Sequence, residues 1–275
     1  MKAAAVQMTS TRDVEANLAE AGRLIAAAAE QGAELVVLPE NFSFLGATDA
    51  ERQAAVEPWG NGPAQRFLAE AAERHGVWLV GGTIPIRERG GERASSRSLL
   101  VAPDGRVAAH YDKIHLFDVD ASAGAAGERA PERYKESAST LAGERVVSAA
   151  TPLGRIGLTV CYDIRFPALF HRLSVLGVDV LVVPAAFTVP TGQVHWQPLL
   201  QARAIESLAY VVAAGQCGEH AGGRKTYGHS MIIGPWGEIL GERADGPGVV
   251  CVDLDMIRLN QLRESFPVVR HRREL

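Results

Sequence analysis

Short apolar runs of strand character alternate with amphipathic helical segments along most of this 275-residue chain. We predict strands at 2–8, 34–38, 77–81, 96–101, 106–111, 146–150, 156–160, 180–183, 210–214, 229–233 and 249–252. We predict helices at 17–31, 63–75, 167–176 and 195–208. This alternation favours an α/β fold in which helices cover sheets. By itself, the pattern does not distinguish a doubly wound sheet from a sandwich of two sheets.

Composition and charge restrict the class of protein. With 47% hydrophobic residues and no low-complexity linker outside 121–127, residues 1–275 are predicted to form a single domain. The net charge of −4 is mild, so we expect neither nucleic acid nor an anionic membrane as a partner. The apolar runs are too short to cross a bilayer, and the chain enters its first strand without a signal peptide. Three cysteines without zinc-binding spacing fit a reducing compartment, so we expect a cytoplasmic protein.

The segment GLTVCYDIRFP at 157–167 runs apolar residues into a cysteine and then breaks into polar residues and a proline. This pattern predicts a buried strand that ends at a sharp strand-to-helix turn. At such a turn Cys161 would be held rigid and exposed at the edge of the sheet, as a nucleophile requires. A buried structural thiol is the alternative for this residue taken alone, because free cysteine is among the most buried residue types.

Two further apolar runs end near side chains that could take part in catalysis. LVVLPENF at 35–42 leads through a proline to Glu40, and YDKIHLF at 111–117 places Lys113 among apolar and aromatic neighbours. Taken singly, Glu40 is typical of a solvated loop and Lys113 of a surface lysine that buries only its stem. The order Glu, Lys, Cys at the ends of three strands favours one shared site.

These segments, together with YGHSM at 227–231, resemble the carbon–nitrogen hydrolase, or nitrilase, superfamily over nearly the whole chain. The resemblance implies a four-layer α-β-β-α sandwich and a catalytic set formed by Glu40, Lys113 and Cys161. It implies that no metal and no organic cofactor is needed. A homodimer or a higher homo-oligomer is also expected.

The chemistry explains why these residue types belong together. A thiol with a pKa of about 8.5 is mostly protonated at neutral pH, so Glu40 is the predicted general base for Cys161. Attack on an amide carbonyl creates an oxyanion, for which Lys113 and the backbone N–H of Tyr162 are the predicted donors. Glu40 then protonates the leaving nitrogen and activates the water that hydrolyses a thioester on Cys161.

Structures of the family carry a second glutamate that positions the lysine and the substrate. The resemblance places it at Glu136, which precedes a serine as in the family pattern. Glu128 and Glu132 are alternatives, because the loop before Glu136 is long and its segment 121–127 is predicted to be flexible.

The segment QCGEH at 216–220, followed by Arg224 and the motif at 227–231, resembles the Nit-type branch that acts on deaminated glutathione. The implied reaction releases 2-oxoglutarate and cysteinylglycine, a metabolite repair. The main alternative is an ω-amidase that acts on 2-oxoglutaramate, and another small-amide or carbamoyl amidohydrolase is a further one.

The same resemblance implies that Arg165, Phe187 and Thr191 contact the substrate. The guanidinium of Arg165 is suited to bind a substrate carboxylate through two parallel bonds. An ion pair between Arg165 and Asp163 is the alternative for this residue.

Other interpretations of the thiol remain at this stage. A Cys–His pair using His115 or His229 is the rival mechanism, and the resemblance favours the carboxylate. Two hypotheses from other functional classes are a catalytically inactive binding or scaffold protein and a redox-sensing thiol protein.

Overall fold

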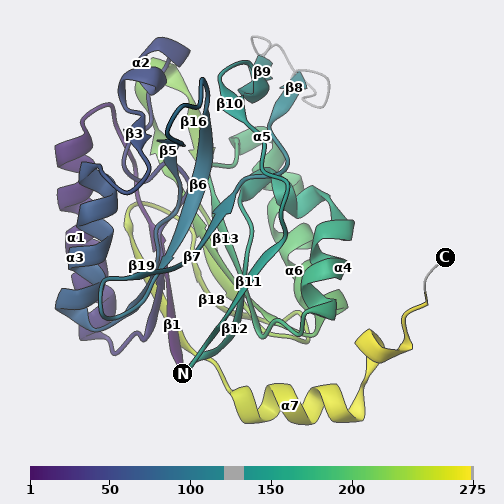
Figure 1. The fold of residues 1–275 in the computed structure, drawn as a ribbon. Helices are drawn as coiled ribbons and strands as arrows, with labels where there is room; N and C mark the ends of the chain where they lie inside the picture. The colour runs from purple at the N-terminus through teal and green to yellow at the C-terminus, as the bar shows by residue number, and fades with distance from the viewer. Residues whose placement is uncertain (121–132, 274–275) are drawn as a thin grey trace.

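Two β-sheets pack face to face in the computed structural model, which describes residues 1–120 and 133–273. Helices α1 (Val14–Glu30) and α3 (Pro63–His75) cover one outer face, and α4 (Pro167–Val175) and α6 (Gln197–Ser207) cover the other (Figure 1). The layers follow the order α-β-β-α. This order confirms the predicted four-layer sandwich and excludes a single doubly wound sheet.

The first sheet is built mainly from the N-terminal half of the chain. Its strands, in order across the sheet, are β19 (Gly248–Asp253), β1 (Lys2–Gln7), β2 (Leu35–Val37), β4 (Trp78–Val80), β6 (Ala94–Val101), β5 (Ile84–Arg87) and β3 (Glu57–Pro58). Two further strands pair with β6, namely β7 (Val107–Asp112) and β10 (Thr140–Leu141). Strands β1, β2 and β4 run parallel, whereas β6 and β7 form the predicted hairpin.

The second sheet comes from the later part of the chain. Its strands, in order, are β11 (Val147–Thr151), β12 (Gly154–Leu158), β13 (Val180–Ala185), β14 (Tyr210–Gly215), β17 (Ser230–Ile233) and β18 (Ile239–Arg243). Strands β12, β13 and β14 run parallel, and α4 and α6 are the crossover helices between them.

Alternate residues of the central strands belong to two different cores. In β1, Ala3 and Ala5 lie in the cluster between the two sheets, whereas Ala4 and Val6 lie in the cluster beneath α1 and α3. Successive side chains of a strand point to opposite faces, and here both faces are covered. The sequences of these strands are therefore continuous apolar runs. A doubly wound sheet has strands of the same kind, so the sequence pattern did not distinguish it from a sandwich.

Some predicted boundaries were wrong, and some elements were not predicted. The helix predicted at 17–31 begins at Val14, because the Asp13 side chain caps it by accepting from the backbone N–H of Ala16. The helix predicted at 195–208 begins at Gln197, after a π-helical turn at Gly192–Trp196. Elements not predicted include α2 (Asp49–Ala54), α5 (Val189–Thr191), α7 (Met256–Ser265) and the short pairs β8 (Asp118–Asp120) with β9 (Arg133–Lys135) and β15 (Cys217–Glu219) with β16 (Lys225–Tyr227).

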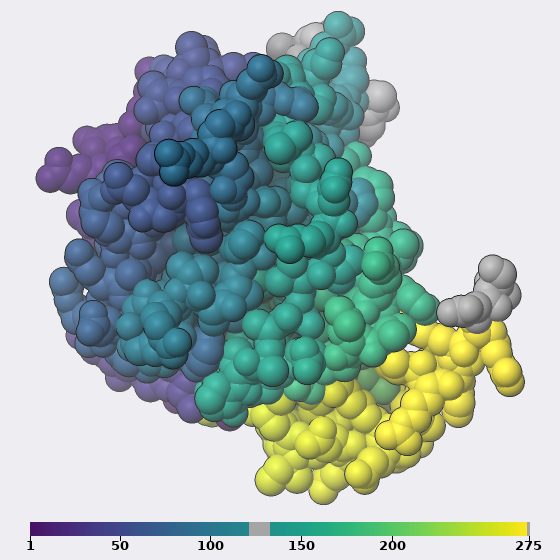
Figure 2. Space-filling view, in the orientation of Figure 1, coloured from purple at the N-terminus to yellow at the C-terminus, as the bar shows by residue number. Residues whose placement is uncertain are grey.

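The two ends of the sandwich differ. Helix α2 and the β8–β9 pair lie at one end, whereas α7 and the C-terminal segment lie at the other and extend beyond the body (Figures 1 and 2). Within the described part of the chain, every helix is too short or too polar to span a membrane.

Candidate active site

A cavity of about 640 Å³ opens at the end of the sandwich that carries α2 and β9. Residues that follow three parallel strands line it: Glu40 after β2, Cys161 after β12 and Ala186 after β13. The loops at the carboxyl ends of parallel strands are the usual place for a ligand site in α/β proteins. Lys113, which follows β7, and Glu136, which follows β9, complete the inner end of the cavity.

Glu40 is fixed by contacts to both its backbone and its side chain. The side chain is only 3% exposed, and its Oε2 accepts from the backbone N–H of Ala186 at 2.8 Å. The Gln216 side chain donates to the Glu40 carbonyl at 3.0 Å. Gly82 lies against this turn with φ +43, and a Cβ there would meet the Pro39 carbonyl oxygen at 1.9 Å. A residue other than glycine at position 82 would therefore push the Pro39–Glu40 backbone out of place.

Lys113 lies between two carboxylates. It is 2% exposed, and its Nζ donates to Glu40 Oε1 and to Glu136 Oε2 at 2.8 Å each. Burial opposes its charge, but the adjacent Glu136 and Glu40 outweigh burial and raise the pKa of Lys113 above its usual value. Lys113 is therefore a permanent cation inside the sandwich.

Glu136 opens a short 3₁₀ turn at Glu136–Ala138. Besides Lys113, its Oε2 accepts from the backbone N–H of Phe117 at 2.8 Å. Burial opposes ionisation of Glu136, but Lys113 and Arg52 prevail and lower its pKa. The structure thus brings Glu136 into contact with Lys113, whereas the alternatives Glu128 and Glu132, like segment 121–127, lie outside the described residues.

Cys161 begins a tight 3₁₀ turn, Cys161–Arg165, between β12 and α4. Its φ of +46 is uncommon for a residue other than glycine, as in the strained turns that present nucleophiles. The prediction that the side chain is exposed was wrong, because Cys161 is 7% exposed and reached through the cavity. Burial, followed by the negative charge of Glu40, raises the pKa of the thiol, and the charge of Lys113 offsets only part of this. The resting thiol is therefore protonated at neutral pH.

Asp163, two residues after the cysteine, holds the turn in shape. Its buried carboxylate accepts from the Val160 backbone N–H at 2.9 Å and from the Tyr111 hydroxyl at 2.7 Å. It also contacts the backbone N–H and Nδ1 of His115. The only role expected for Asp163 was an ion pair with Arg165. That ion pair is not present among the described residues.

The predicted rival bases lie elsewhere. The Nδ1 of His115 is 2.7 Å from Asp163, and its ring stacks on Phe166. The Nδ1 of His229 is 2.6 Å from Glu242. Neither histidine belongs to the cavity lining formed by the described residues, so the geometry favours the carboxylate over a Cys–His pair.

The predicted substrate contacts fall into two groups. Phe187, Thr191 and Tyr162 line the cavity, and Tyr162 is the second residue of the Cys161 turn, where backbone N–H groups have no intrahelical partner. The lining formed by the described residues does not include Arg165. Its guanidinium lies over the Phe187 ring at 5.1 Å, and its Nη1 is 3.2 Å from Nδ1 of His195.

Three lining arginines, Arg52, Arg133 and Arg224, were missed as site residues. Arg52 projects from α2, and Arg224 follows the 3₁₀ turn at Ala221–Gly223. Arg224 was noted only as part of a motif, and Arg52 carried no sequence signal. The described residues hold no group of three or more His, Cys, Asp or Glu side chains arranged to bind a metal.

Comparison with known proteins agrees with this geometry. The model of the family described as carbon-nitrogen hydrolase matches residues 2–264. The chain belongs to this family. Its members hydrolyse carbon–nitrogen bonds, and the present chain is a hydrolase of the amidase type.

Individual relatives are similar over nearly the full chain. The chain is 44% identical to the deaminated glutathione amidase of Synechocystis sp. (strain PCC 6803 / GT-S), covering 98% of this chain and 97% of that protein. The crystal structure of the C. elegans NitFhit protein matches with a TM-score of 0.88 at 36% identity, covering 99% of this chain and 65% of that longer one. Saccharomyces cerevisiae Nit3, a member of branch 10 of the nitrilase superfamily, matches with a TM-score of 0.86 at 30% identity, covering 100% and 97% of the two chains.

Proposed function

We propose that this carbon–nitrogen hydrolase cleaves deaminated glutathione through a thioester on Cys161. The observation that carries the mechanism is the contact of Lys113 with both Glu40 and Glu136 beside a buried, protonated thiol. The substrate rests on relatives such as the Synechocystis protein, which carries the name deaminated glutathione amidase.

In the acylation step, Glu40 accepts the thiol proton as the sulfur attacks the amide carbonyl. We assign Glu40 as the base because it lines the same cavity as Cys161 and its negative charge raises the pKa of the thiol. Lys113 and the backbone N–H of Tyr162 stabilise the oxyanion. Glu136 keeps the Lys113 ammonium in position by sharing its Nζ with Glu40.

The tetrahedral intermediate then collapses. Glu40 donates its proton to the nitrogen, cysteinylglycine leaves, and the 2-oxoglutaryl group remains on Cys161 as a thioester. Glu40 next removes a proton from water, and the resulting attack on the thioester releases 2-oxoglutarate. The sulfur leaves as a thiolate and recovers the proton from Glu40, so the enzyme is restored.

On the acyl side, we propose that Arg165 acts with Phe187 and Thr191. Phe187 and Thr191 line the cavity, and the Arg165 guanidinium lies over the Phe187 ring. Arg165 also ends the 3₁₀ turn that Cys161 begins, so its charge belongs to the same turn as the nucleophile. A carboxylate next to the 2-oxo group suits this charge.

The size of the cavity favours a substrate with a large leaving group. A volume of about 640 Å³ lies within the range of sites that enclose drug-sized molecules. With 2-oxoglutaramate the leaving group is only ammonia, and the smaller substrate would fill less of this volume. The ω-amidase activity is therefore the weaker candidate.

A cytoplasmic location, a single domain over residues 1–275 and a homo-oligomer, at least a dimer, belong to the same proposal. A reducing compartment keeps the reactive thiol from oxidation. Light scattering during gel filtration measures the assembly directly, and a monomeric mass would contradict the last point.

A side-by-side turnover assay tests the function. The substrates are deaminated glutathione, 2-oxoglutaramate and an N-carbamoyl amine, with Cys161→Ala as the control for contaminating activity. We expect the highest kcat/KM for deaminated glutathione. A higher value for 2-oxoglutaramate would favour an ω-amidase, and turnover of the carbamoyl amine alone would overturn the 2-oxo-acid assignment.

A further inference from the structure

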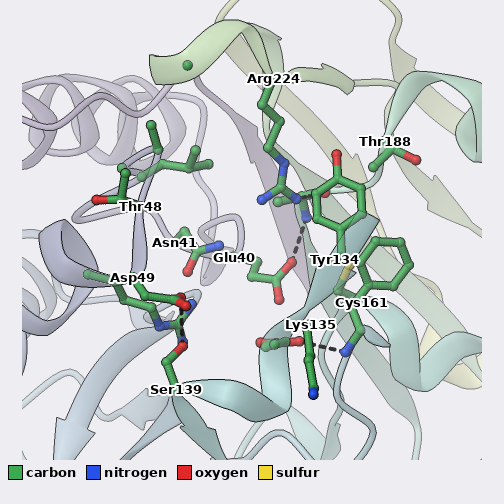
Figure 3. A pocket seen from close by; sticks show the side chains of 18 of the residues that line it. Glu40, Asn41, Thr48, Asp49, Tyr134, Lys135, Ser139, Cys161, Thr188 and Arg224 are labelled. Atoms are coloured by element: carbon green, nitrogen blue, oxygen red, sulfur yellow. Dashed lines mark hydrogen bonds between the residues drawn. The ribbon is translucent and has the colours of Figure 1, made fainter. Parts of the chain in front are cut away.

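Arg224 points into the cavity from the loop that joins β15 and β16, and its guanidinium lies beside the Tyr134 ring (Figure 3). Its Nη2 donates to the Ala186 carbonyl at 2.9 Å, and its Cζ lies 5.3 Å from the centroid of Tyr134. Both contacts are made to groups without a formal charge. Among the described residues, no carboxylate lies within 4.0 Å of this guanidinium.

One nitrogen of this arginine lacks a partner altogether. The Nε of Arg224 is buried and makes no hydrogen bond within the described structure. A buried donor of a charged group that is left unsatisfied costs free energy, and such groups are normally paired. Arginine offers five N–H donors in a planar fork that matches a carboxylate. Arg224 is thus a cation with spare donors at the wall of a substrate cavity.

A short chain of hydrogen bonds connects Arg224 to Glu40. Arg224 binds the carbonyl of Ala186, and the N–H of the same residue binds Glu40 Oε2. In the proposed mechanism Glu40 protonates the leaving nitrogen, so the amine portion of the substrate lies on this side of Cys161. The other carboxylate oxygen of Glu40, Oε1, is bound by Lys113, the proposed oxyanion donor.

Arg165 and Arg224 occupy different parts of the site. Arg165 is the last residue of the turn that Cys161 begins, and its guanidinium lies over the Phe187 ring. Arg224 lines the cavity and binds the carbonyl of Ala186, whose N–H binds Glu40. Tyr134 flanks the Arg224 fork and limits its movement.

We propose that Arg224 binds a carboxylate carried by the amine portion of the substrate. The enzyme would then select amides whose leaving group is an amino acid or a small peptide with a free carboxyl terminus, in preference to primary amides. This inference rests on the proposed function and adds a specificity-determining residue to it.

The test compares substrates that differ only at that carboxylate. Wild type and Arg224→Gln are assayed with 2-oxoglutaryl-cysteinylglycine, with its C-terminal carboxamide, and with 2-oxoglutaramate. For wild type we expect the free acid to exceed its carboxamide by about tenfold to a hundredfold in kcat/KM, as the loss of a charged hydrogen-bonded pair predicts. Arg224→Gln should lose that preference by losing activity on the acid, while its activity on the other two changes by less than about threefold.

Two controls complete the design. Arg74→Gln removes a charge from the exposed face of α3 and should leave all three kcat/KM values unchanged. Thermal unfolding of Arg224→Gln shows whether the variant is folded, and Arg224→Lys, which keeps the charge but not the fork, should restore only part of the preference.

The outcomes separate the two proposals. An equal loss on the acid and its carboxamide would give Arg224 a purely structural role and overturn the inference. A wild type that does not distinguish acid from carboxamide would also overturn it, while leaving the proposed function intact. Failure of wild type to hydrolyse any of the three would overturn the proposed function, and the inference with it.

Discussion

The inner end of the cavity, around Lys113, and its outer wall, around Arg224, differ in how their cations are paired. At the inner end, Lys113 is bound by both Glu40 and Glu136, and each carboxylate also accepts a backbone N–H. At the outer wall, the contacts of the Arg224 guanidinium with described residues are to a carbonyl oxygen and an aromatic ring. The inner end is thus organised by the protein itself, as preorganised catalysis requires. The outer wall instead carries a cation without a carboxylate partner among the described residues.

We therefore expect the inner end to determine the rate of the chemical step and the outer wall to determine which substrates are preferred. Changes at the inner end should lower turnover of every substrate, and changes at the wall should lower turnover only of substrates with the matching group.

The largest effect is expected from Cys161→Ala. Removal of the nucleophile should lower kcat by about 10⁴-fold or more, because no other group can form the thioester. The thermal midpoint should stay close to that of wild type, since the turn is held by Asp163 and not by the sulfur. Residual activity above about one per cent on any substrate, in protein free of contaminating hydrolase, would remove Cys161 from the mechanism.

Lys113→Ala should be the next most damaging change. Loss of an oxyanion donor costs about a hundredfold to a thousandfold in kcat. The variant also leaves Glu40 and Glu136 buried together without their cation, so we expect a loss of about 3–5 kcal/mol in the free energy of unfolding. Turnover and urea unfolding measure the two effects.

Lys225→Ala is the matched control for that experiment. Lys225 forms an exposed ion pair with Glu219, and such pairs contribute at most about 1 kcal/mol. Equal destabilisation by the two substitutions would show that the buried network at Lys113 is not held together as described.

Glu136→Gln tests the electrostatic part of the inner end. The pKa of Glu136 is lower in the folded state than in the unfolded state. Its negative charge therefore stabilises the fold fully at pH values above the unfolded-state pKa of about 4.3. This stabilisation disappears as the pH falls through the folded-state pKa. The difference in unfolding free energy between wild type and variant should therefore be full at neutral pH and shrink at acidic pH. Glu73→Gln, on the exposed side of α3, should show a much smaller difference, and a Glu136 difference independent of pH would contradict the account.

Arg165→Lys should have the smallest effect and only on suitable substrates. Lysine keeps the charge but not the planar fork, so kcat/KM for 2-oxoglutaryl amides should fall by about tenfold to a hundredfold. Alkylation of Cys161 by iodoacetamide does not need the fork and should be unchanged. An equal loss of both reactivities would mean that Arg165 supports the Cys161 turn instead of the substrate.

The sequence predicted the inner end better than the wall. Glu40, Lys113 and Cys161 each follow a strand within a distinctive segment, so local pattern and family resemblance were enough to find them. Their burial was not predictable locally, because it depends on how the second sheet and the loops close over them. Cys161 was expected to be exposed for this reason.

The wall depends on contacts between distant parts of the chain. Arg224 reaches the site because its loop packs against Ala186 and Tyr134, which lie 38 and 90 positions away in the sequence. The missed elements are of the same kind. Helix α7 buries only Leu259 fully, so it has little of the apolar periodicity from which a helix is predicted.

The most direct test of the account is a search for the thioester during turnover. Wild-type enzyme is mixed with excess deaminated glutathione, quenched with acid within its first turnovers, and analysed by intact mass and peptide mapping. The account predicts an added 2-oxoglutaryl group on the peptide that contains Cys161, and no such adduct in Cys161→Ala. Undiminished product formation with no adduct under these conditions, or an adduct on Cys217 or Cys251 instead, would contradict it.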